Sequence, residues 1–351
     1  MKFASDNWSG VLPEVSNALQ RHAEGFATAY GDSMLDRSIE RKFAELFERE
    51  CDVFFVGTGT AANSMAAAAA SRPGGVVFAQ SEAHVIANEG GAPESFTNGG
   101  RLVPVAGKDC LMDPDELKAT IKRYPNTFNH LGQGTMVTIT QSTEAGTVYG
   151  IEDIQRICEV AKAADLPVHM DGARFANGLV KLGCSPAEMT WKCGIDMVSF
   201  GATKNGCWSA EALLIFNDKL LHDFKFLRKR MGHLFSKTRF ISAQFEGYFE
   251  NDAWLSAARH SNGIGAALEE MVSRSNRVRL AWQSGTNQVF FIADQAHAEK
   301  MLDQGAAFYP FPAPKRIAEA MAESEQLYRL VASFSSTHQD VEALASLIET
   351  C

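Results

Sequence analysis

The sequence has few features of a membrane, nucleic-acid-binding or disulfide-stabilised protein. No apolar run reaches the roughly 20 residues needed to cross a bilayer, and the first residues turn polar too soon for a secretory leader. A net charge of −9 argues against nucleic acid or an anionic membrane surface as a partner. The seven cysteines are an odd number and include no C-x-x-C pair. We therefore expect free thiols in a reducing cytoplasm.

Two common nucleotide-binding signatures are also missing. The stretch Gly57–Asn63 (G-T-G-T-A-A-N) follows an apolar run and opens a helix-like segment. No Lys-Ser/Thr pair follows its glycines, as a P-loop requires, and no glycine stands third, as the dinucleotide motif requires. Small residues at a helix start can still hold an oxyanion through backbone N–H groups, helped by the Thr58 and Thr60 hydroxyls. The stretch is a candidate phosphate cup, although Gly-Thr runs also form ordinary tight turns.

The chain is predicted to be an α/β protein with two domains. Its 351 residues exceed the usual size of one hydrophobic core. Helix-like and strand-like segments alternate from about residue 35 to 220, which favours a mostly parallel sheet. We expect a large domain with an N-terminal arm over residues 1–247 and a small α/β domain over 248–351, with a Pro-rich loop at 309–314. Strands are expected at 53–56, 76–79, 135–140, 168–170, 197–200, 212–216, 288–293 and 329–333, and helices at 37–49, 60–70 and 151–164.

Two ionisable residues follow strand-like apolar runs among small neighbours. Asp171 comes directly after Val168–Met170, and Lys204 follows Met197–Phe200 and a Gly-Ala-Thr loop. The carboxyl ends of parallel strands meet at one edge of a sheet, where ligands bind. A lysine and an aspartate at that edge suit pyridoxal phosphate (PLP). The amine forms a Schiff base, and the carboxylate keeps the pyridine nitrogen protonated so that the ring withdraws electrons.

Each of these residues also has an ordinary structural interpretation. Lys204 could be a surface residue, but its flanks are too small and apolar for a solvated turn. Asp171 could cap the following loop and pair with Arg174. In the functional interpretation it is the pyridinium partner, held from behind by His169 on the same strand face. His84, in the loop after residues 76–79, could be a structural histidine or a flat ring stacked on a flat cofactor.

In combination these motifs resemble those of the PLP-dependent L-threonine aldolases, in the β-eliminating lyase group of fold type I. The resemblance favours the branch with S-F-G-A-T-K-N-G around the lysine, which includes low-specificity and phenylserine-type enzymes. It implies the fold type I PLP-dependent transferase-like architecture. It also implies retro-aldol cleavage of β-hydroxy-α-amino acids, such as L-threonine, L-allo-threonine or phenylserine, to glycine and an aldehyde. The motifs are S-D-N at 5–7, A-Y-G-D at 29–32, G-T-G-T-A-A-N at 57–63, A-H at 83–84, H-M-D-G-A-R at 169–174 and A-T-K-N-G at 202–206, with Arg329 near the end.

The resemblance implies a role for each candidate residue and a homotetramer built as a pair of dimers with shared sites. No metal ion is implied. Lys204 is the expected Schiff-base lysine, Asp171 the pyridine-nitrogen partner and His84 the stacked ring. Thr58, Gly59 and Thr60 are expected to hold the phosphate, with Arg230 or Arg239 reaching it across a subunit interface. Ser5, Arg174 and Arg329 are expected to bind the substrate carboxylate, and Arg174 also to lie near the cofactor. Tyr30 is expected to line the site of a neighbouring subunit.

One departure from the family pattern concerns Glu144, which stands where many members have a histidine, after the strand that ends at Thr140. Its carboxylate could accept a proton if burial raised its pKa, or it could be a structural hydrogen-bond acceptor. The substrate preference stays open with it. Two alternatives to the aldolase also stay open. One is another PLP reaction on the same scaffold, such as β-elimination, transamination or decarboxylation. The other is a non-catalytic relative used as a binding module, against which Lys204, Asp171 and the phosphate cup argue.

Overall fold

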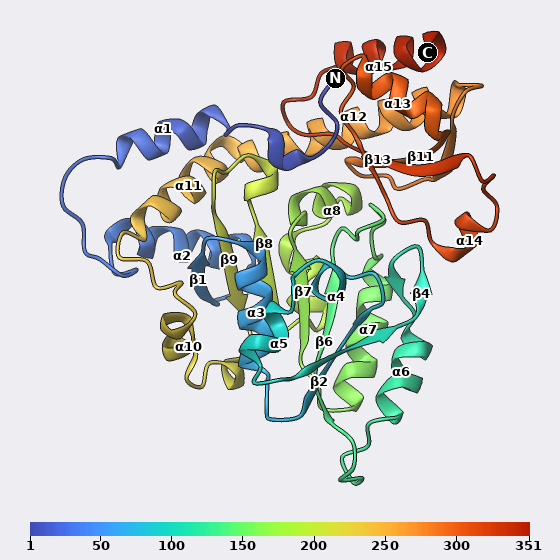
Figure 1. Cartoon of the computed structure of the whole chain (residues 1–351). Coiled ribbons are helices and arrows are strands. Elements are labelled where there is room, and N and C mark those ends of the chain that lie inside the picture. The colour runs from blue at the N-terminus through green and yellow to red at the C-terminus, as the bar shows by residue number, and fades with distance from the viewer.

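A seven-stranded sheet forms the centre of the large domain in the computed structural model, which describes residues 1–351 (Figure 1). From one edge to the other its strands are β1 (Asp52–Val56), β9 (Glu211–Ile215), β8 (Met197–Gly201), β7 (Val168–Gly172), β6 (Gln133–Thr140), β2 (Gly75–Gln80) and β3 (Arg101–Val105). Strand β9 runs antiparallel to both of its neighbours, β1 and β8, and all the other neighbouring pairs in this sheet are parallel. The predicted α/β fold with a mostly parallel sheet is therefore confirmed.

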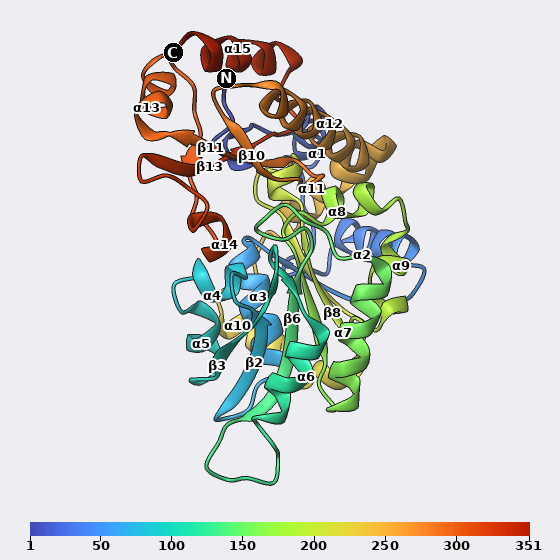
Figure 2. The ribbon, with the colours of Figure 1, turned by 90° about the vertical axis from the view of Figure 1, so that its right-hand side faces the viewer.

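Helices cover both faces of this sheet (Figure 2). Successive side chains of a strand point to opposite faces, so β1 sends Val53 and Phe55 into one apolar core and Phe54 and Val56 into another. The first core is covered by α2 (Met34–Leu46), α6 (Pro114–Lys122), α7 (Ile151–Ala163), α8 (Phe175–Leu182) and α11 (Arg239–Phe249), and the second by α3 (Gly59–Ala69) and α10 (Phe224–Arg230).

Shorter elements connect these layers. They are η1 (Asp6–Trp8), α1 (Pro13–Arg21), α4 (His84–Ala87), α5 (Ala92–Phe96), the hairpin of β4 (Gly107–Lys108) and β5 (Leu111–Met112), α9 (Pro186–Met189), η2 (Trp191–Cys193), η3 (Thr203–Asn205), η4 (Asp218–Leu220) and η5 (Glu250–Asp252). No helix in the chain combines the length and apolarity required to traverse a membrane.

Aromatic packing holds the strand that leads to Lys204. Phe200, next to last in β8, is fully buried, and its ring lies 5.0 to 5.8 Å, between centroids, from those of Phe43, Phe175 and Trp254. Beyond the lysine, the Asn205 side-chain amide donates hydrogen bonds to the Tyr248 hydroxyl at 2.7 Å and the Trp254 carbonyl at 2.8 Å. The loop that carries Lys204 is thus anchored on both sides.

The small domain is built on an antiparallel sheet. In sheet order its strands are β10 (Arg279–Trp282), β11 (Gln288–Asp294), β13 (Glu325–Val331) and β12 (Tyr309–Pro310), packed with α13 (Gln295–Asp303), α14 (Lys315–Ala318) and α15 (His338–Thr350). The chain's first residues join it, because Phe3 packs in its core and Lys2 bridges to Ala307.

The long helix α12 (Ala253–Arg274) joins the two domains. Trp254 at its start belongs to a large-domain core, whereas Leu268 belongs to the small-domain core. Tyr248, where the sequence predicted the domain boundary, is buried in the large-domain core. The boundary itself stays a prediction.

The structure corrects several local expectations. The last strand covers Glu325–Val331 instead of 329–333, so Arg329 lies inside it, and two residues of the expected Pro-rich loop, Tyr309–Pro310, pair with it. The sequence analysis missed β3, in which Pro104 interrupts the strand pattern. A proline is tolerated there because β3 is an edge strand. Helix α2 begins three residues earlier than expected, because Ser33 and Asp36 form a capping box.

Candidate active site

A cavity of about 640 Å³ lies where the carboxyl ends of the parallel strands face the small domain. That volume is within the range of small-molecule sites. The sheet edge supplies Asp171 from β7 and Lys204 from the loop after β8, while the small domain supplies Arg329 from β13. The predicted residues that share this lining are Ser5, His84, Glu144, Asp171, Arg174, Lys204 and Arg329.

Asp171 is held by hydrogen-bond donors rather than by a cation. Its Oδ1 accepts a bond from the Ala173 backbone N–H at 3.0 Å, and its Oδ2 accepts one from the Asn63 side-chain amide at 2.9 Å. The loop-capping part of the ordinary interpretation is correct, but the pairing with Arg174 is wrong. A carboxylate oxygen accepts more than one hydrogen bond, so Asp171 can still receive a donor from a ligand.

His169 does not hold Asp171 from behind, as the sequence suggested. Its Nδ1 lies 2.9 Å from the Thr138 hydroxyl and its Nε2 lies 2.8 Å from the Ser199 hydroxyl. Burial lowers the pKa of His169 to about 4, so the ring is neutral at physiological pH. The histidine cross-links β6, β7 and β8 next to the aspartate and contributes no charge.

The side-chain amine of Lys204 is buried away from water. Burial, together with the charge of Arg174, lowers the pKa of Lys204 below its usual value. Removal from water makes the neutral, nucleophilic amine easier to populate.

Glu211, buried on β9, accepts a hydrogen bond from the Thr203 backbone N–H at 3.4 Å. Burial raises the pKa of Glu211 to about 7.

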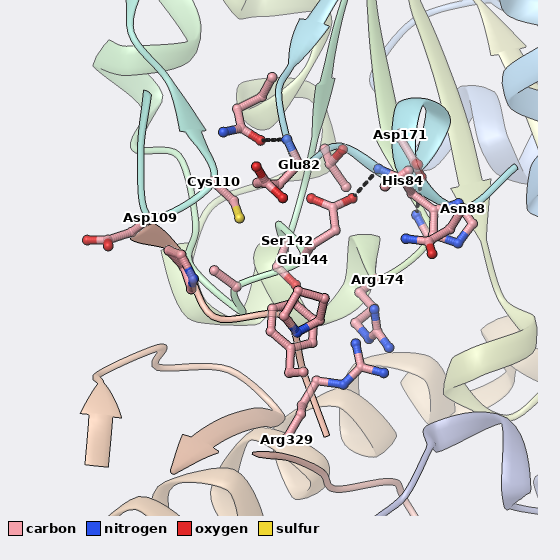
Figure 3. Close-up of a pocket in the computed structure, with 18 of the residues that line it drawn as sticks. Glu82, His84, Asn88, Asp109, Cys110, Ser142, Glu144, Asp171, Arg174 and Arg329 are labelled. Atoms are coloured by element: carbon pink, nitrogen blue, oxygen red, sulfur yellow. Dashed lines mark hydrogen bonds between the residues drawn. The ribbon is translucent and has the colours of Figure 1, made fainter. Parts of the chain in front are cut away.

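The two arginines of the cavity differ in their partners (Figure 3). Arg174 forms a bidentate pair with Asp6 through Nε at 2.8 Å and Nη2 at 3.1 Å. Burial alone would raise the pKa of Asp6, but the charges of Arg174 and Lys204 outweigh it and the pKa is lowered.

The Arg329 guanidinium makes no hydrogen bond or ion pair within the chain, and its Nε is buried without a partner. Its Cζ lies 5.4 Å from the centroid of the Phe311 ring, a cation–π contact. Burial, followed by the charge of Arg174, lowers the pKa of Arg329 to about 10, which still leaves it cationic at neutral pH. The two guanidinium groups lie next to each other on the same side of the cavity in Figure 3. An anion between them would satisfy donors that otherwise have no partner.

Glu144 lies on the opposite side of the cavity from Arg329, near Glu82 and Cys110 (Figure 3). Its Oε1 accepts a hydrogen bond from the His84 backbone N–H at 2.8 Å. Burial and then the charge of Asp171 raise the pKa of Glu144 to about 7. Both protonation states are therefore populated near neutral pH, as acid–base work requires.

Several predicted residues lie outside the cavity lining. Thr58, Gly59 and Thr60 start α3, where the Thr58 hydroxyl caps the helix and the first-turn N–H groups have no helical partner. One turn later the Asn63 side chain reaches Asp171, so this helix start lies close to the aspartate. The phosphate-cup assignment stays a prediction.

Arg230, Arg239 and Tyr30 also lie outside the lining. Arg230 is exposed at the end of α10, and the Arg239 guanidinium donates to the Gly25 carbonyl at 3.0 Å. Tyr30 is about half exposed, under the Lys229 ammonium. Their roles across a subunit interface stay predictions.

The sequence analysis missed functional partners that come from distant segments. Asp6 lies in a motif that had been singled out, but nothing in the sequence linked it to Arg174, 168 residues away. Asn63 and Glu89 carried no signal of their own. His233, whose Nδ1 lies 3.5 Å from the Gly57 backbone nitrogen, is the basic side chain of this chain that contacts the predicted phosphate cup.

Comparison with known proteins agrees with this geometry. The beta-eliminating lyase family model matches residues 2–296. Low specificity L-threonine aldolases from Pseudomonas sp. (strain NCIMB 10558) and Pseudomonas aeruginosa are each 39% identical over 310 residues, which is 88% of this chain and 89% of theirs. The solved structure of Leishmania major threonine aldolase, 26% identical, superposes with a TM-score of 0.91 over 99% of this chain and 98% of that one. The chain therefore belongs to the beta-eliminating lyase family and has the fold type I architecture of the threonine aldolases.

Proposed function

We propose that the protein is a PLP-dependent aldolase that cleaves β-hydroxy-α-amino acids of the threonine or phenylserine type to glycine and an aldehyde. One observation carries the proposal: a buried lysine, Lys204, shares a cavity with an arginine, Arg329, whose guanidinium has no hydrogen-bond acceptor or carboxylate partner. An amine and an anion site at that edge of the sheet are what an α-amino acid and PLP require together. The similarity to low specificity L-threonine aldolases supports this choice of reaction.

The residues present fit the cofactor. Lys204 would attach it, Asp171 would face its ring nitrogen with lone pairs still free, and the start of α3 would hold its phosphate. His84, on the cavity wall, would lie against the ring. When bound, PLP supplies an electron sink for the electron pair left on the substrate's Cα.

The arginine side of the cavity would bind the substrate carboxylate. Arg329 offers a planar fork with no competing hydrogen-bond acceptor, supported by the Phe311 ring, while Asp6 holds Arg174 in a fixed orientation. Ser5 lines the same wall, and its hydroxyl accepts from the Asn7 backbone N–H at 3.1 Å, which leaves its own proton free to donate. A carboxylate held here orients the remainder of the substrate toward Glu144 on the opposite side.

Glu144 would take the proton of the β-hydroxyl group when the Cα–Cβ bond breaks. By the resemblance to the threonine aldolases it stands where many members have a histidine, and its raised pKa gives it the proton affinity that the role requires. Burial supplies that affinity here, whereas an imidazole has it intrinsically. If Glu144 served only as a structural hydrogen-bond acceptor, the reaction rate would not depend on the ionisation of its carboxyl group.

The assembly and the cellular compartment are further parts of the proposal. Tyr30, Phe26 and Met34 are exposed on one N-terminal segment, an apolar surface suited to a neighbouring subunit of a homotetramer. All seven cysteines are free, in keeping with a reducing cytoplasm.

The function is tested by incubating the PLP-loaded enzyme with L-threonine, L-allo-threonine and phenylserine and measuring glycine and aldehyde. Lys204→Ala is expected to abolish turnover and to leave no borohydride-reducible cofactor linkage, because it removes the attaching amine. A linkage that persists in the variant contradicts the assignment. Ammonia and a keto acid in place of glycine and aldehyde indicate β-elimination, and pyridoxamine phosphate indicates transamination.

The arginine site is tested by Arg329→Lys. The loss of the bidentate fork should raise KM for phenylserine at least about tenfold while cofactor content stays at the wild-type level. Arg279→Lys, on strand β10 of the same sheet and paired with Glu325 at the surface, is a matched control and should leave KM unchanged. An unchanged KM in the Arg329 variant rejects the carboxylate site.

The pH dependence tests Glu144. A base with its pKa raised to about 7 is inactive when protonated, so kcat/KM should rise as the pH increases through about 7. Glu144→Gln should remove this limb and lower kcat by about 100-fold or more, the typical contribution of general base catalysis. Glu152→Gln, on the exposed face of α7, serves as control. A limb near pH 7 that survives in Glu144→Gln belongs to another group.

Shared active sites are tested by complementation. Lys204→Ala and an inactive Tyr30 variant are mixed under conditions that exchange subunits. If Tyr30 serves a neighbour's site, mixed oligomers contain some sites with both residues intact, and activity returns. Absence of rescue despite demonstrated exchange means that Tyr30 acts within its own chain or has no role.

A further inference from the structure

A carboxylate that no motif identified lies directly behind the cavity. Glu89, in the turn between α4 and α5, has a side chain with 0% exposure. Its Oε1 accepts a hydrogen bond from the Asn63 side-chain amide at 2.8 Å and lies 3.1 Å from His84 Nδ1. Its Oε2 is buried with no partner. No lysine or arginine contacts it, so His84 is the basic group that pairs with it.

The chemistry of this contact assigns the proton on His84. A carboxylate only accepts hydrogen bonds, and an ionised carboxylate buried without donors is costly. The proton at the 3.1 Å contact therefore belongs to Nδ1 of His84. The imidazole side chain is 40% exposed and lines the cavity, so Nε2 is the nitrogen left to face a ligand.

Both ends of His84 are tethered to glutamates. Its ring Nδ1 lies 3.1 Å from Glu89 Oε1. Its backbone N–H donates to Glu144 Oε1 at 2.8 Å (Figure 3). The helix that starts at His84 is a single turn, closed by the Asn88 N–H to the His84 carbonyl at 2.8 Å. So short a helix supplies little rigidity of its own, and the ring's orientation depends on the side-chain contact.

Asn63 connects this pair to the sheet. The same amide nitrogen that donates to Glu89 donates to Asp171 Oδ2 at 2.9 Å, and Asn63 Oδ1 has no partner. Two acceptors on one side leave only one sensible orientation for the amide, with its NH₂ group between the carboxylates. Glu89 is therefore fixed relative to Asp171, the residue that would meet the cofactor's ring nitrogen.

We propose that Glu89 is a positioning residue that sets the tautomer and the orientation of His84, with Nδ1 protonated and Nε2 presented to the bound substrate and cofactor. The inference rests on the proposed function for its kinetic consequence, although the hydrogen bond itself does not. Carboxylate–histidine pairs use this same arrangement elsewhere to select which ring nitrogen faces the chemistry.

The kinetic experiment uses Glu89→Met in the PLP-loaded enzyme, since methionine keeps the length of the side chain and removes both acceptors. We expect kcat to fall about 10- to 100-fold, the usual effect of losing such an outer partner, with KM changed less than about threefold. Glu94→Met is the matched control. It lies outside the cavity lining, also has a buried carboxylate oxygen with no partner, and should leave kcat within about twofold.

A double-mutant cycle separates positioning from general support of the fold. In a His84→Asn background, Glu89→Met should change kcat by less than about twofold, because Glu89 acts through a ring that is no longer present. A loss as large as that in the wild-type background means that Glu89 acts by another route, such as Asn63 and Asp171, and overturns the proposal.

A direct observation of the proton needs neither the Glu89 variant nor aldolase activity. Solid-state ¹⁵N NMR of histidine-labelled wild-type enzyme, with His84 identified by its absence in His84→Asn, should show Nδ1 protonated. A His84 ring that carries its proton only on Nε2 refutes the proposal. Wild-type enzyme that produces no glycine or aldehyde from any substrate, but shows the protonated Nδ1, rejects the proposed function and leaves the Glu89–His84 pair standing.

Discussion

The candidate site depends on one side-chain amide, that of Asn63. It donates two hydrogen bonds from the same nitrogen, to Asp171 on the central sheet and to Glu89 behind His84. Two buried carboxylates so close together would repel each other if both were ionised, and the shared donor lies between them. This one amide therefore fixes the positions of the start of α3, the end of β7 and the turn after α4 relative to one another. These are the three segments that would meet the phosphate, the ring nitrogen and the face of PLP.

The charges of the cavity are separated rather than scattered. Arginines occupy the side nearest the small domain, and Glu144 and Glu82 occupy the other (Figure 3). Asp6 accepts two hydrogen bonds from Arg174, whereas the Arg329 guanidinium, which lies over the Phe311 ring, has no acceptor or carboxylate partner. A buried cation of this kind is costly in the free protein, and an anionic ligand relieves the cost. The cavity is thus polarised along the direction in which an amino acid would lie.

The large apolar cores allow this polar edge to exist. Phe200 is packed among aromatic rings at the carboxyl end of β8, and Asn205 is anchored to Tyr248 and Trp254 just beyond Lys204. Aromatic packing and the Asn205 amide therefore hold the lysine loop, together with the hydrogen bond from the Thr203 backbone N–H to Glu211. The same cores extend through Trp254 into the helix that joins the domains, which places Arg329 of the small domain opposite Lys204 of the large one.

The sequence by itself determined the α/β class, most strand and helix positions, and the candidate site residues whose side-chain type indicates a chemical role. These residues are Lys204, Asp171, His84 and Glu144. The class, the elements, Lys204, Asp171 and His84 follow from local patterns: apolar runs of strand length, small residues around an ionisable group, and turns at strand ends. Glu144 was singled out by the resemblance to the threonine aldolases. Only the tertiary structure decided their partners. Arg174 pairs with Asp6 from the far N-terminus instead of Asp171, His169 binds Thr138 and Ser199, and Glu89 meets His84. Hydrogen bonds between distant segments depend on how strands and helices pack, and a local sequence pattern does not specify that packing.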